Sequence, residues 1–306
     1  MRSPGKDIVE MFGFAPDDVS DDSRGIFQSK CCPFLGSTCT KTNHDQSEIY
    51  GTCSVTSGRN EVIICPKRLY ANTYEPFQHV KTRIWGEIPL IVGGSSQELR
   101  QKALQHPECV VAFGQNSGGE VTINSNGKLS IDWILQRYQK TAGRLMPVDF
   151  AALEVQSIDI TGNYRDNFLA YKSLREGRRV NFVPPAGHGL NWANVHKRLI
   201  PQIIRKGNIY HHMGRCVAFV FVLPKIVYEK FDEILGDVEE EQSHSRENLT
   251  VFTYSLGKIT PAGSIRGLVL DGVKHHSLAN IVFAFSSNTQ DGAPEALESK
   301  LKTLLY

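Results

Sequence analysis

The feature that most constrains the fold is an alternation of strand-like and helix-like patterns that begins near residue 86. Apolar or alternating runs indicate strands, and apolar residues three and four apart indicate helices. Such alternation is typical of α/β proteins, so we predict an α/β core with a mixed central sheet. The predicted strands are 88–92, 109–113, 119–124, 128–133, 148–161, 215–224, 249–256 and 279–287. The predicted helices are 95–104, 166–176, 191–212, 225–235 and one that opens near Pro294, with a bend in the third at Pro201.

The first 80 residues differ from the rest of the chain, because they are irregular and hold five of the seven cysteines. The cysteines Cys32, Cys39, Cys53 and Cys65 follow the pattern C-x6-C-x13-C-x11-C. Four thiolates can close a tetrahedral shell around a metal ion, which would stabilise a module that has little core of its own. We therefore predict a cysteine-rich metal-binding module at 1–80, followed by the main domain at 81–306.

Other interpretations of the cysteines remain open. The four thiols could be buried as small hydrophobic groups, and Cys31 could compete with its neighbour as a ligand. Cys109 and Cys216 occur in apolar strand patterns, so we expect them in the core.

Composition excludes some classes of protein. No apolar run reaches the roughly 20 residues that span a bilayer, and the N-terminus has no signal-peptide pattern. We therefore expect a cytoplasmic, bacterial-type protein without a membrane partner. No glycine-rich phosphate-binding loop occurs, which argues against a nucleotide cofactor. The net charge of +2 neither requires nor excludes nucleic acid, and basic residues cluster at 172–179 and 197–206, where solvated helix faces are the simplest explanation.

Three polar residues interrupt the apolar strand patterns of the core. Glu154 and Gln156 are two apart in the run 148–161, so their side chains would share one face of a strand. Asp132 ends a neighbouring strand pattern, and together these groups could form an oxygen-rich pocket for Mg²⁺. Glu120 could add a carboxylate from a loop. A bound cation of this kind can polarise a phosphodiester and activate water, although the same residue pattern also arises by chance.

Several short motifs occur together and in order: CPF at 32–34, IICP at 63–66, GGE at 118–120, DW at 132–133, LEVQ at 153–156, GNY at 162–164 and GRCVAF at 214–219. With the four cysteines, they make the chain resemble the NotI-type type II restriction endonucleases over about residues 7–235. The resemblance implies a PD-(D/E)xK nuclease core that acts on double-stranded DNA.

Residue roles follow from the resemblance at the matching positions. Asp132 and Glu154 would bind catalytic Mg²⁺, and Glu120 would approach a second metal position. Gln156 would replace the lysine of many superfamily members, which places more of the catalysis on the metal ions. Cys32, Cys39, Cys53 and Cys65 would bind iron, with zinc as the other candidate.

The resemblance also implies a target. A homodimer would cut a GC-rich palindrome centred on GGCC, such as CGGCCG. Basic residues of 165–179 and 197–206 would read guanines, with Asn163, Asn191 and Asn194 as neighbours, unless they only contact phosphates. The alternative is a non-catalytic nucleic-acid-binding protein that uses the cysteine module as its reader. His188, His211, His212, His275 and His276 fit turn, surface or helix-end positions better than a catalytic base.

Overall fold

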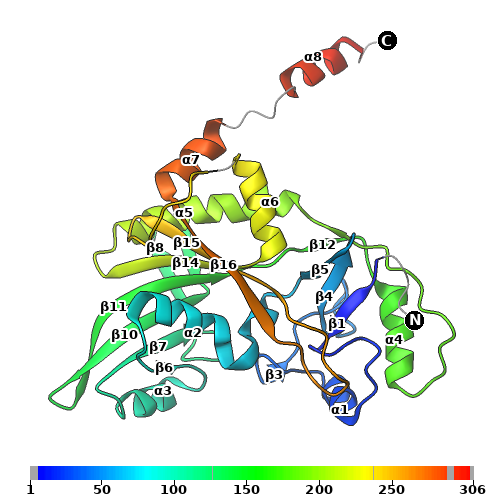
Figure 1. Cartoon of the computed structure of the whole chain (residues 1–306), viewed down its shortest axis with the longest axis horizontal. Coiled ribbons are helices and arrows are strands. Elements are labelled where there is room, and N and C mark those ends of the chain that lie inside the picture. Colours follow the sequence, from blue (N-terminus) through cyan, green and yellow to red (C-terminus); the bar gives the residue numbers. More distant parts are fainter. Residues whose placement is uncertain (1–5, 126, 237, 288–292, 304–306) are drawn as a thin grey trace.

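The computed structural model describes residues 6–125, 127–236, 238–287 and 293–303. Within these ranges a mixed sheet of seven strands forms the centre of the molecule, in the order β16-β15-β14-β11-β10-β7-β6 (Figure 1). The pairs β6–β7, β11–β14 and β14–β15 are parallel, and the other pairs are antiparallel. The strands are β6 (Leu90–Ile91), β7 (Glu108–Gly114), β10 (Trp133–Thr141), β11 (Arg144–Val155), β14 (Cys216–Pro224), β15 (Asn248–Leu256) and β16 (Leu268–Ser277). The predicted α/β fold with a mixed central sheet is confirmed.

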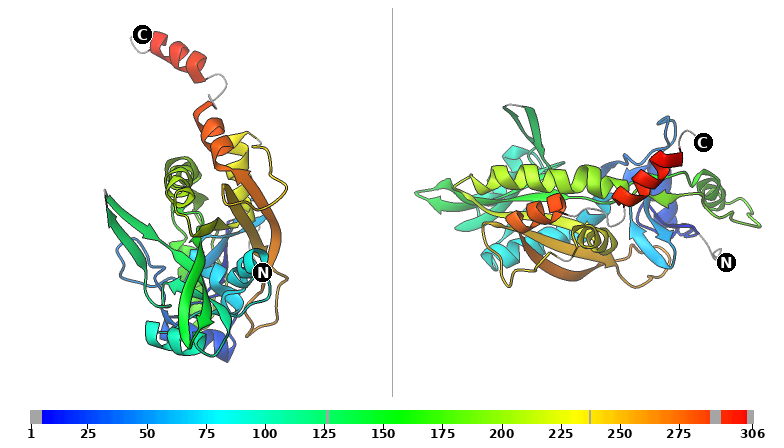
Figure 2. Two further views of the ribbon diagram at one scale, coloured as in Figure 1. Left: turned by 90° about the vertical axis from the view of Figure 1, so that its left-hand side faces the viewer. Right: turned by 90° about the horizontal axis from the view of Figure 1, so that it is seen from above.

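Helices flank this sheet. The helices outside the N-terminal region are α3 (Ser96–Ala103), α4 (Arg165–Arg175), α5 (Ile200–His211), α6 (Lys225–Leu235), α7 (Leu278–Ser287) and α8 (Ala293–Thr303). Helix α3 packs on β6 and β7, whereas α5 and α6 pack on β14 and on α7. Seen from above, α5 runs lengthwise over the sheet (Figure 2, right), and in the other view α8 stands apart from the body (Figure 2, left). None of the described helices is long and apolar enough for a bilayer span.

The start of α3 shows how local sequence sets an element. The Ser95 side chain accepts a hydrogen bond from the backbone of Glu98, and the Glu98 carboxylate accepts one from the backbone of Ser95. This capping box satisfies two N–H groups that the first turn leaves unpaired. The predicted helix is confirmed, and it begins at Ser96 with Ser95 as its N-cap.

The predicted strand at 279–287 is wrong, because that segment is helix α7. The seventh strand is instead β16, whose residues include Asp271 and Lys274. An edge strand can expose polar side chains, so its sequence lacks the apolar run that marks a buried strand. A run rich in apolar residues does not by itself separate a strand from a helix.

The N-terminal region packs against the central sheet and does not form a separate core. Its elements are β1 (Ile8–Met11), α1 (Asp21–Ser29), β2 (Cys31–Cys32), β3 (Ser37–Thr38), β4 (Thr52–Ser57), β5 (Asn60–Ile63), the 3-10 helix η1 (Pro66–Tyr70) and α2 (Ala71–Trp85). β1, β4 and β5 form a small antiparallel sheet. One continuous hydrophobic cluster joins Val55 of β4 to Val220 of β14. The boundary at residue 80 remains a prediction.

A buried ion pair joins two parts of this region. The Arg68 guanidinium of η1 donates two hydrogen bonds of 3.0 Å to the Glu10 carboxylate of β1, and both side chains are fully buried. Ser54 donates a further hydrogen bond of 2.7 Å to Glu10. These bonds offset the cost of burying both charges.

Three short elements complete the chain. β8 (Val121–Ser125) and β9 (Gly127–Ile131) form a separate hairpin immediately before β10. β12 (Ile160–Thr161) pairs with β13 (Gly189–Leu190), and the π-helical turn η2 (Val195–Leu199) leads into α5. The irregular turn lies just before Pro201, where the bend was predicted.

Two histidine predictions are wrong. His275 and His276 lie in β16 and are 3% and 1% exposed, because the loop 238–247 and helix α6 cover that strand. The His276 ring forms a hydrogen bond of 2.9 Å with the Tyr228 hydroxyl. His188 lies outside any helix or strand, as expected for a turn residue, but it is buried against the Thr56 carbonyl. His211 and His212 are exposed at the end of α5.

Candidate active site

Strands β10 and β11 bring two of the expected carboxylates together. Their antiparallel register places Trp133 opposite Leu153, so Asp132, one residue before β10, adjoins Glu154 near the end of β11. The Asp132 carboxylate accepts a hydrogen bond of 3.1 Å from the backbone N–H of Val155. Trp133 is fully buried and anchors this end of β10, with its indole N–H donating to the Tyr70 hydroxyl at 3.0 Å.

Glu154 is fully buried, and its two carboxylate oxygens have different surroundings. Oε2 accepts a hydrogen bond of 2.5 Å from the ammonium group of Lys206 in α5. Oε1 is buried without a hydrogen-bond partner among the described residues. Burial and the charge of Asp132 raise the pKa of Glu154 to about 7, although Lys206 opposes the shift. A buried, unpaired carboxylate oxygen is costly unless a ligand completes its coordination.

Sequence reasoning did not place Lys206 beside Glu154. It lies 52 residues after Glu154 and was grouped with the basic residues expected on a solvated face. Its only distinguishing signal is its place in the apolar spacing of α5, whose buried residues are Ile200, Ile203, Lys206, Gly207 and Tyr210. The Tyr210 hydroxyl, one turn further along α5, is also buried and lacks a partner among the described residues.

Gln156 and Glu120 lie in different surroundings from this pair. Gln156 follows the last residue of β11 and is half-buried beside a cavity of about 240 Å³. Glu120 is exposed on the loop before β8, and no hydrogen bond or ion pair joins it to Asp132 or Glu154 within the described chain. The roles expected for both residues remain predictions.

A polar groove continues from Gln156. The cavity beside it shares Asp159, Asn194 and Arg198 with a larger one of about 860 Å³. Residues 41–50, between the second and third of the four cysteines, supply one wall of the larger cavity. The expected DNA neighbours that line it are Asn163, Asn191 and Asn194.

The basic stretches divide into buried and exposed groups. Arg175 is 2% exposed and donates a 2.8 Å hydrogen bond to the Ala15 carbonyl, so it cannot read a base from this position. Lys206 is buried on Glu154, and Lys172 is paired with Glu48. The prediction that these residues lie on solvated helix faces, or read guanines, is therefore wrong for Arg175 and Lys206. Arg178, Arg179, Lys197, Arg198 and Arg205 are exposed.

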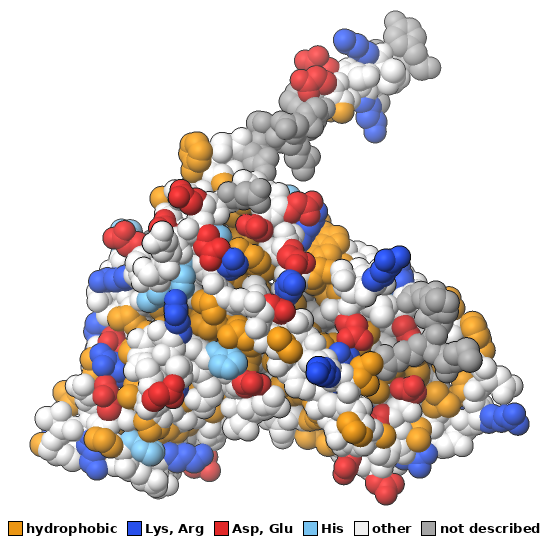
Figure 3. Space-filling view, viewed as in Figure 1, with side chains coloured by type: hydrophobic (Ala, Val, Ile, Leu, Met, Phe, Trp, Pro, Cys, Tyr) orange, Lys and Arg blue, Asp and Glu red, His pale blue; other side chains and the backbone are white. Residues whose placement is uncertain are grey.

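The surface charges do not form a patch of one sign on the face shown in Figure 3. Blue and red side chains are interspersed there, as the near-zero net charge leads one to expect. The charges on this face therefore do not by themselves mark a DNA-binding surface.

The four expected cysteine ligands are buried in one neighbourhood. Cys32, Cys39, Cys53 and Cys65 are free thiols between 4% and 8% exposed. Burial raises the pKa of Cys39 to about 11, with further contributions from Cys32 and Cys65. Burial likewise raises the pKa of Cys53, again with a contribution from Cys65. Thiolates are the soft donors that a soft or borderline metal ion prefers.

In the conformation described, the thiols are not yet arranged as a ligand set. No group of three or more histidine, cysteine or acidic side chains among the described residues is placed to hold a metal ion. Cys31 is half-buried next to Cys32. Cys109 and Cys216 are buried in β7 and β14, so their predicted core positions are confirmed.

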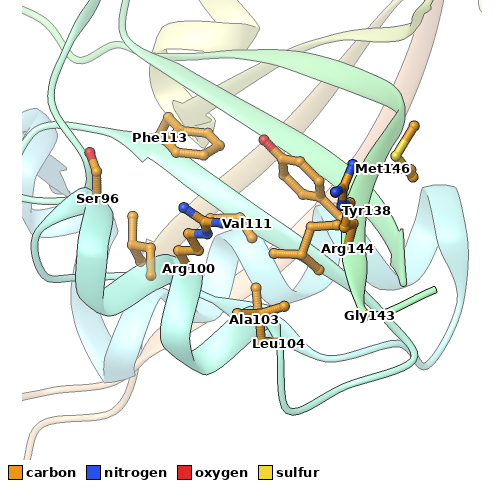
Figure 4. A pocket seen from close by; sticks show the side chains of 12 residues that line it. Ser96, Arg100, Ala103, Leu104, Val111, Phe113, Tyr138, Gly143, Arg144 and Met146 are labelled. Carbon is orange, nitrogen blue, oxygen red and sulfur yellow. The ribbon is translucent and has the colours of Figure 1, made fainter. Parts of the chain in front are cut away.

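A further cavity of about 450 Å³ lies between α3 and the β10–β11 hairpin, with Phe113 and Tyr138 on its walls (Figure 4). It extends along β10 from Tyr138 to the level of Ile134, which pairs with Phe113 of β7. Its lining includes neither Asp132 nor Glu154.

Comparison with known proteins identifies the family. The family model described as "Restriction endonuclease NotI" matches residues 26–266, most of the chain. No curated protein matches the sequence. The matched region contains the four cysteines, the paired carboxylates, Lys206 and the polar groove. The chain therefore belongs to the NotI restriction endonuclease family, which makes it a type II, site-specific deoxyribonuclease that binds double-stranded DNA.

Proposed function

We propose that the enzyme hydrolyses phosphodiester bonds with Mg²⁺ bound between Asp132 and Glu154, in an active site of the PD-(D/E)xK type. The observation that carries this proposal is the unpaired, buried Oε1 of Glu154 beside the Asp132 carboxylate. Two adjacent carboxylates offer the hard oxygen ligands that Mg²⁺ prefers. When bound, the cation would polarise the phosphate and lower the pKa of a water molecule.

The protein groups have distinct tasks in this proposal. The backbone N–H of Val155 holds one oxygen of Asp132, which fixes the carboxylate beside Glu154. Strand β11 is central in the sheet, so the position of Glu154 is set by partners on both sides. Gln156 has a neutral amide, which can orient a water molecule but cannot accept its proton. Glu120 would have to approach from its loop to serve a second metal ion.

We propose that the duplex lies along the groove that runs from Gln156 past Asn194 and Arg198. Arg198 is exposed there and pairs with Asp159 at 3.5 Å, a weak contact that a phosphate could replace. The cysteine module supplies the opposite wall. That wall would be held in place by a structural iron ion, with zinc as the alternative, bound by Cys32, Cys39, Cys53 and Cys65.

The decisive experiment measures cleavage and binding separately. Asp132→Ala and Glu154→Ala should lower the cleavage rate at least about 10³-fold in Mg²⁺, whereas binding in Ca²⁺ should change little because phosphate contacts dominate affinity. Cleavage is followed on gels and affinity by fluorescence anisotropy. Cleavage by Glu154→Ala at the parental rate would exclude this site.

The target is proposed to be a GC-rich palindrome such as CGGCCG, cut by a homodimer. One active site per chain can cut both strands symmetrically when two copies are related by a two-fold axis. A mixed genomic DNA is digested and the fragment ends are sequenced. Ends at AT-rich or asymmetric sites would refute the target and leave the nuclease assignment intact.

A further inference from the structure

Lys206 occupies a position that neither the motif pattern nor the family match assigns. It reaches the proposed active site from α5, whereas Glu154 belongs to β11 and Asp132 directly precedes β10. Its side chain is 11% exposed and its ammonium group lies 2.5 Å from Glu154 Oε2. The neutral Gln156 stands two residues after Glu154, directly after the end of β11. Within the described residues, this ammonium group is therefore the cation in direct contact with the carboxylate pair.

A purely structural role explains this arrangement poorly. A buried ion pair contributes little net stability, because desolvation of both charges offsets their attraction. A stabilising pair would also have both carboxylate oxygens satisfied, as Glu10 does in its pair with Arg68. Here Glu154 Oε1 and the nearby Tyr210 hydroxyl both lack partners. The cluster is incomplete on one side, as expected where a ligand binds.

Helix α5 is held firmly enough to position a side chain. A Cβ atom on Gly207 would lie 2.7 Å from the Leu278 side chain of α7, so the two helices are in close contact at this residue. Tyr210 packs on Phe219 of β14, with ring centroids 4.9 Å apart. Contacts with α7 and with the sheet thus fix the helix on either side of the ammonium group.

We propose that Lys206 is the positioning residue of the cleavage reaction, and that it acts through Glu154. Its ammonium group holds Oε2 and thereby directs Oε1 toward the substrate side. It also places a positive charge near the phosphate, which Gln156 cannot do. This inference rests on the proposed active site at Asp132 and Glu154.

The test uses Lys206→Met, Lys206→Gln and Lys206→Arg in the full-length protein, with Lys225→Met as the matched control. Lys225 is an exposed cation at the start of α6, outside both basic stretches. The readouts are kcat and KM on a duplex that carries the mapped site, DNA affinity in Ca²⁺, and Ca²⁺ binding by calorimetry. Lys206→Gln keeps a hydrogen-bond donor without the charge. It takes the place of Lys206→Met in the test if that variant does not fold.

Lys206→Met and Lys206→Gln should lower kcat by about 10²- to 10⁴-fold, in the range expected for a positioned proton-transfer or charge-stabilising group. KM and DNA affinity should change less than about threefold, since phosphate contacts set affinity. Ca²⁺ should bind as well or better, because a positive charge has been removed beside its ligands. Lys206→Arg should recover part of kcat, and Lys225→Met should resemble the parent.

Two results would overturn the proposal. One is a kcat within threefold of the parent in a folded, uncharged variant. The other is a loss of Ca²⁺ binding that accounts for the loss of kcat, because Lys206 would then only maintain the metal site. Failure of the proposed function looks different: Glu154→Ala would cut normally, or the parent would not require Mg²⁺.

Discussion

At the scale of single residues, the end of β10 depends on a glycine. A Cβ atom on Gly114 of β7 would lie 2.4 Å from the Trp133 ring and 2.6 Å from the carbonyl oxygen of Asp132. Only hydrogen fits at that position, and the packed indole in turn anchors the residue that precedes it. The identity of residue 114 thus contributes directly to the placement of a proposed metal ligand.

Gly114→Ala should therefore displace Trp133 and Asp132, destabilise the protein by about 1–3 kcal/mol through overpacking, and lower cleavage further than stability alone explains. Urea unfolding and the cleavage rate of the folded protein measure the two effects. Gly25→Ala is the control, because Gly25 lies in α1 with open space around it. Equal changes in unfolding free energy and in cleavage rate for Gly114→Ala and Gly25→Ala would show that the tight contact has no consequence.

At the scale of elements, the cysteine segments connect to the active site through η1. Cys65 immediately precedes this helix, and Tyr70 at its end accepts the hydrogen bond of Trp133. Ser157, next to Gln156, donates a 3.0 Å hydrogen bond to the carbonyl of Ile64. Disorder around the cysteines would therefore affect both ends of the proposed catalytic pocket.

Replacement of Cys32, Cys39, Cys53 or Cys65 by serine should abolish stoichiometric metal binding and lower the melting temperature, because bound metal contributes folding free energy. Metal content is measured on fresh protein by elemental analysis, and melting by circular dichroism. Cys109→Ser and Cys216→Ser should leave the metal content unchanged. Parental protein without iron or zinc would remove the metal site from the proposal.

At the scale of the whole molecule, buried histidines link stability to pH. His188, His275 and His276 are buried, and burial lowers the pKa of each imidazole below its usual value near 6.5. At pH values between the lowered pKa of the folded state and 6.5, the unfolded chain binds more protons than the folded chain. Their contribution to stability is therefore fully present above about pH 6.5 and is lost as pH falls below it.

The contribution of these imidazoles to the free energy of unfolding should accordingly decrease between pH 7.5 and pH 5.5, whereas Glu154, whose pKa is raised to about 7, contributes in the opposite sense. His276→Gln keeps a partner for the Tyr228 hydroxyl and should make this dependence less steep. Denaturant titrations at both pH values measure the effect, with His211→Gln as the exposed control. Identical pH dependence in the two variants would contradict the role of the buried ring.

Local sequence was sufficient to predict most of the helices and strands. It was also sufficient to place two of the four proposed catalytic residues next to each other. Apolar spacing located α3, and a long apolar-rich run located β11. The adjacency of Asp132 and Glu154 followed from two strand patterns, because neighbouring antiparallel strands place their residues side by side. Such inferences succeed because periodicity and capping depend on residues only a few positions apart.

The contacts between distant segments were decided only when the helices and sheets packed. The pairing of Lys206 with Glu154 depends on how α5 crosses β14, and no local pattern encodes that crossing. The same holds for the burial of Arg175 and His276 and for the helical state of α7. A side chain's charge is visible in the sequence, but its solvation and its partner are properties of the tertiary structure, because both depend on which surfaces the fold removes from water.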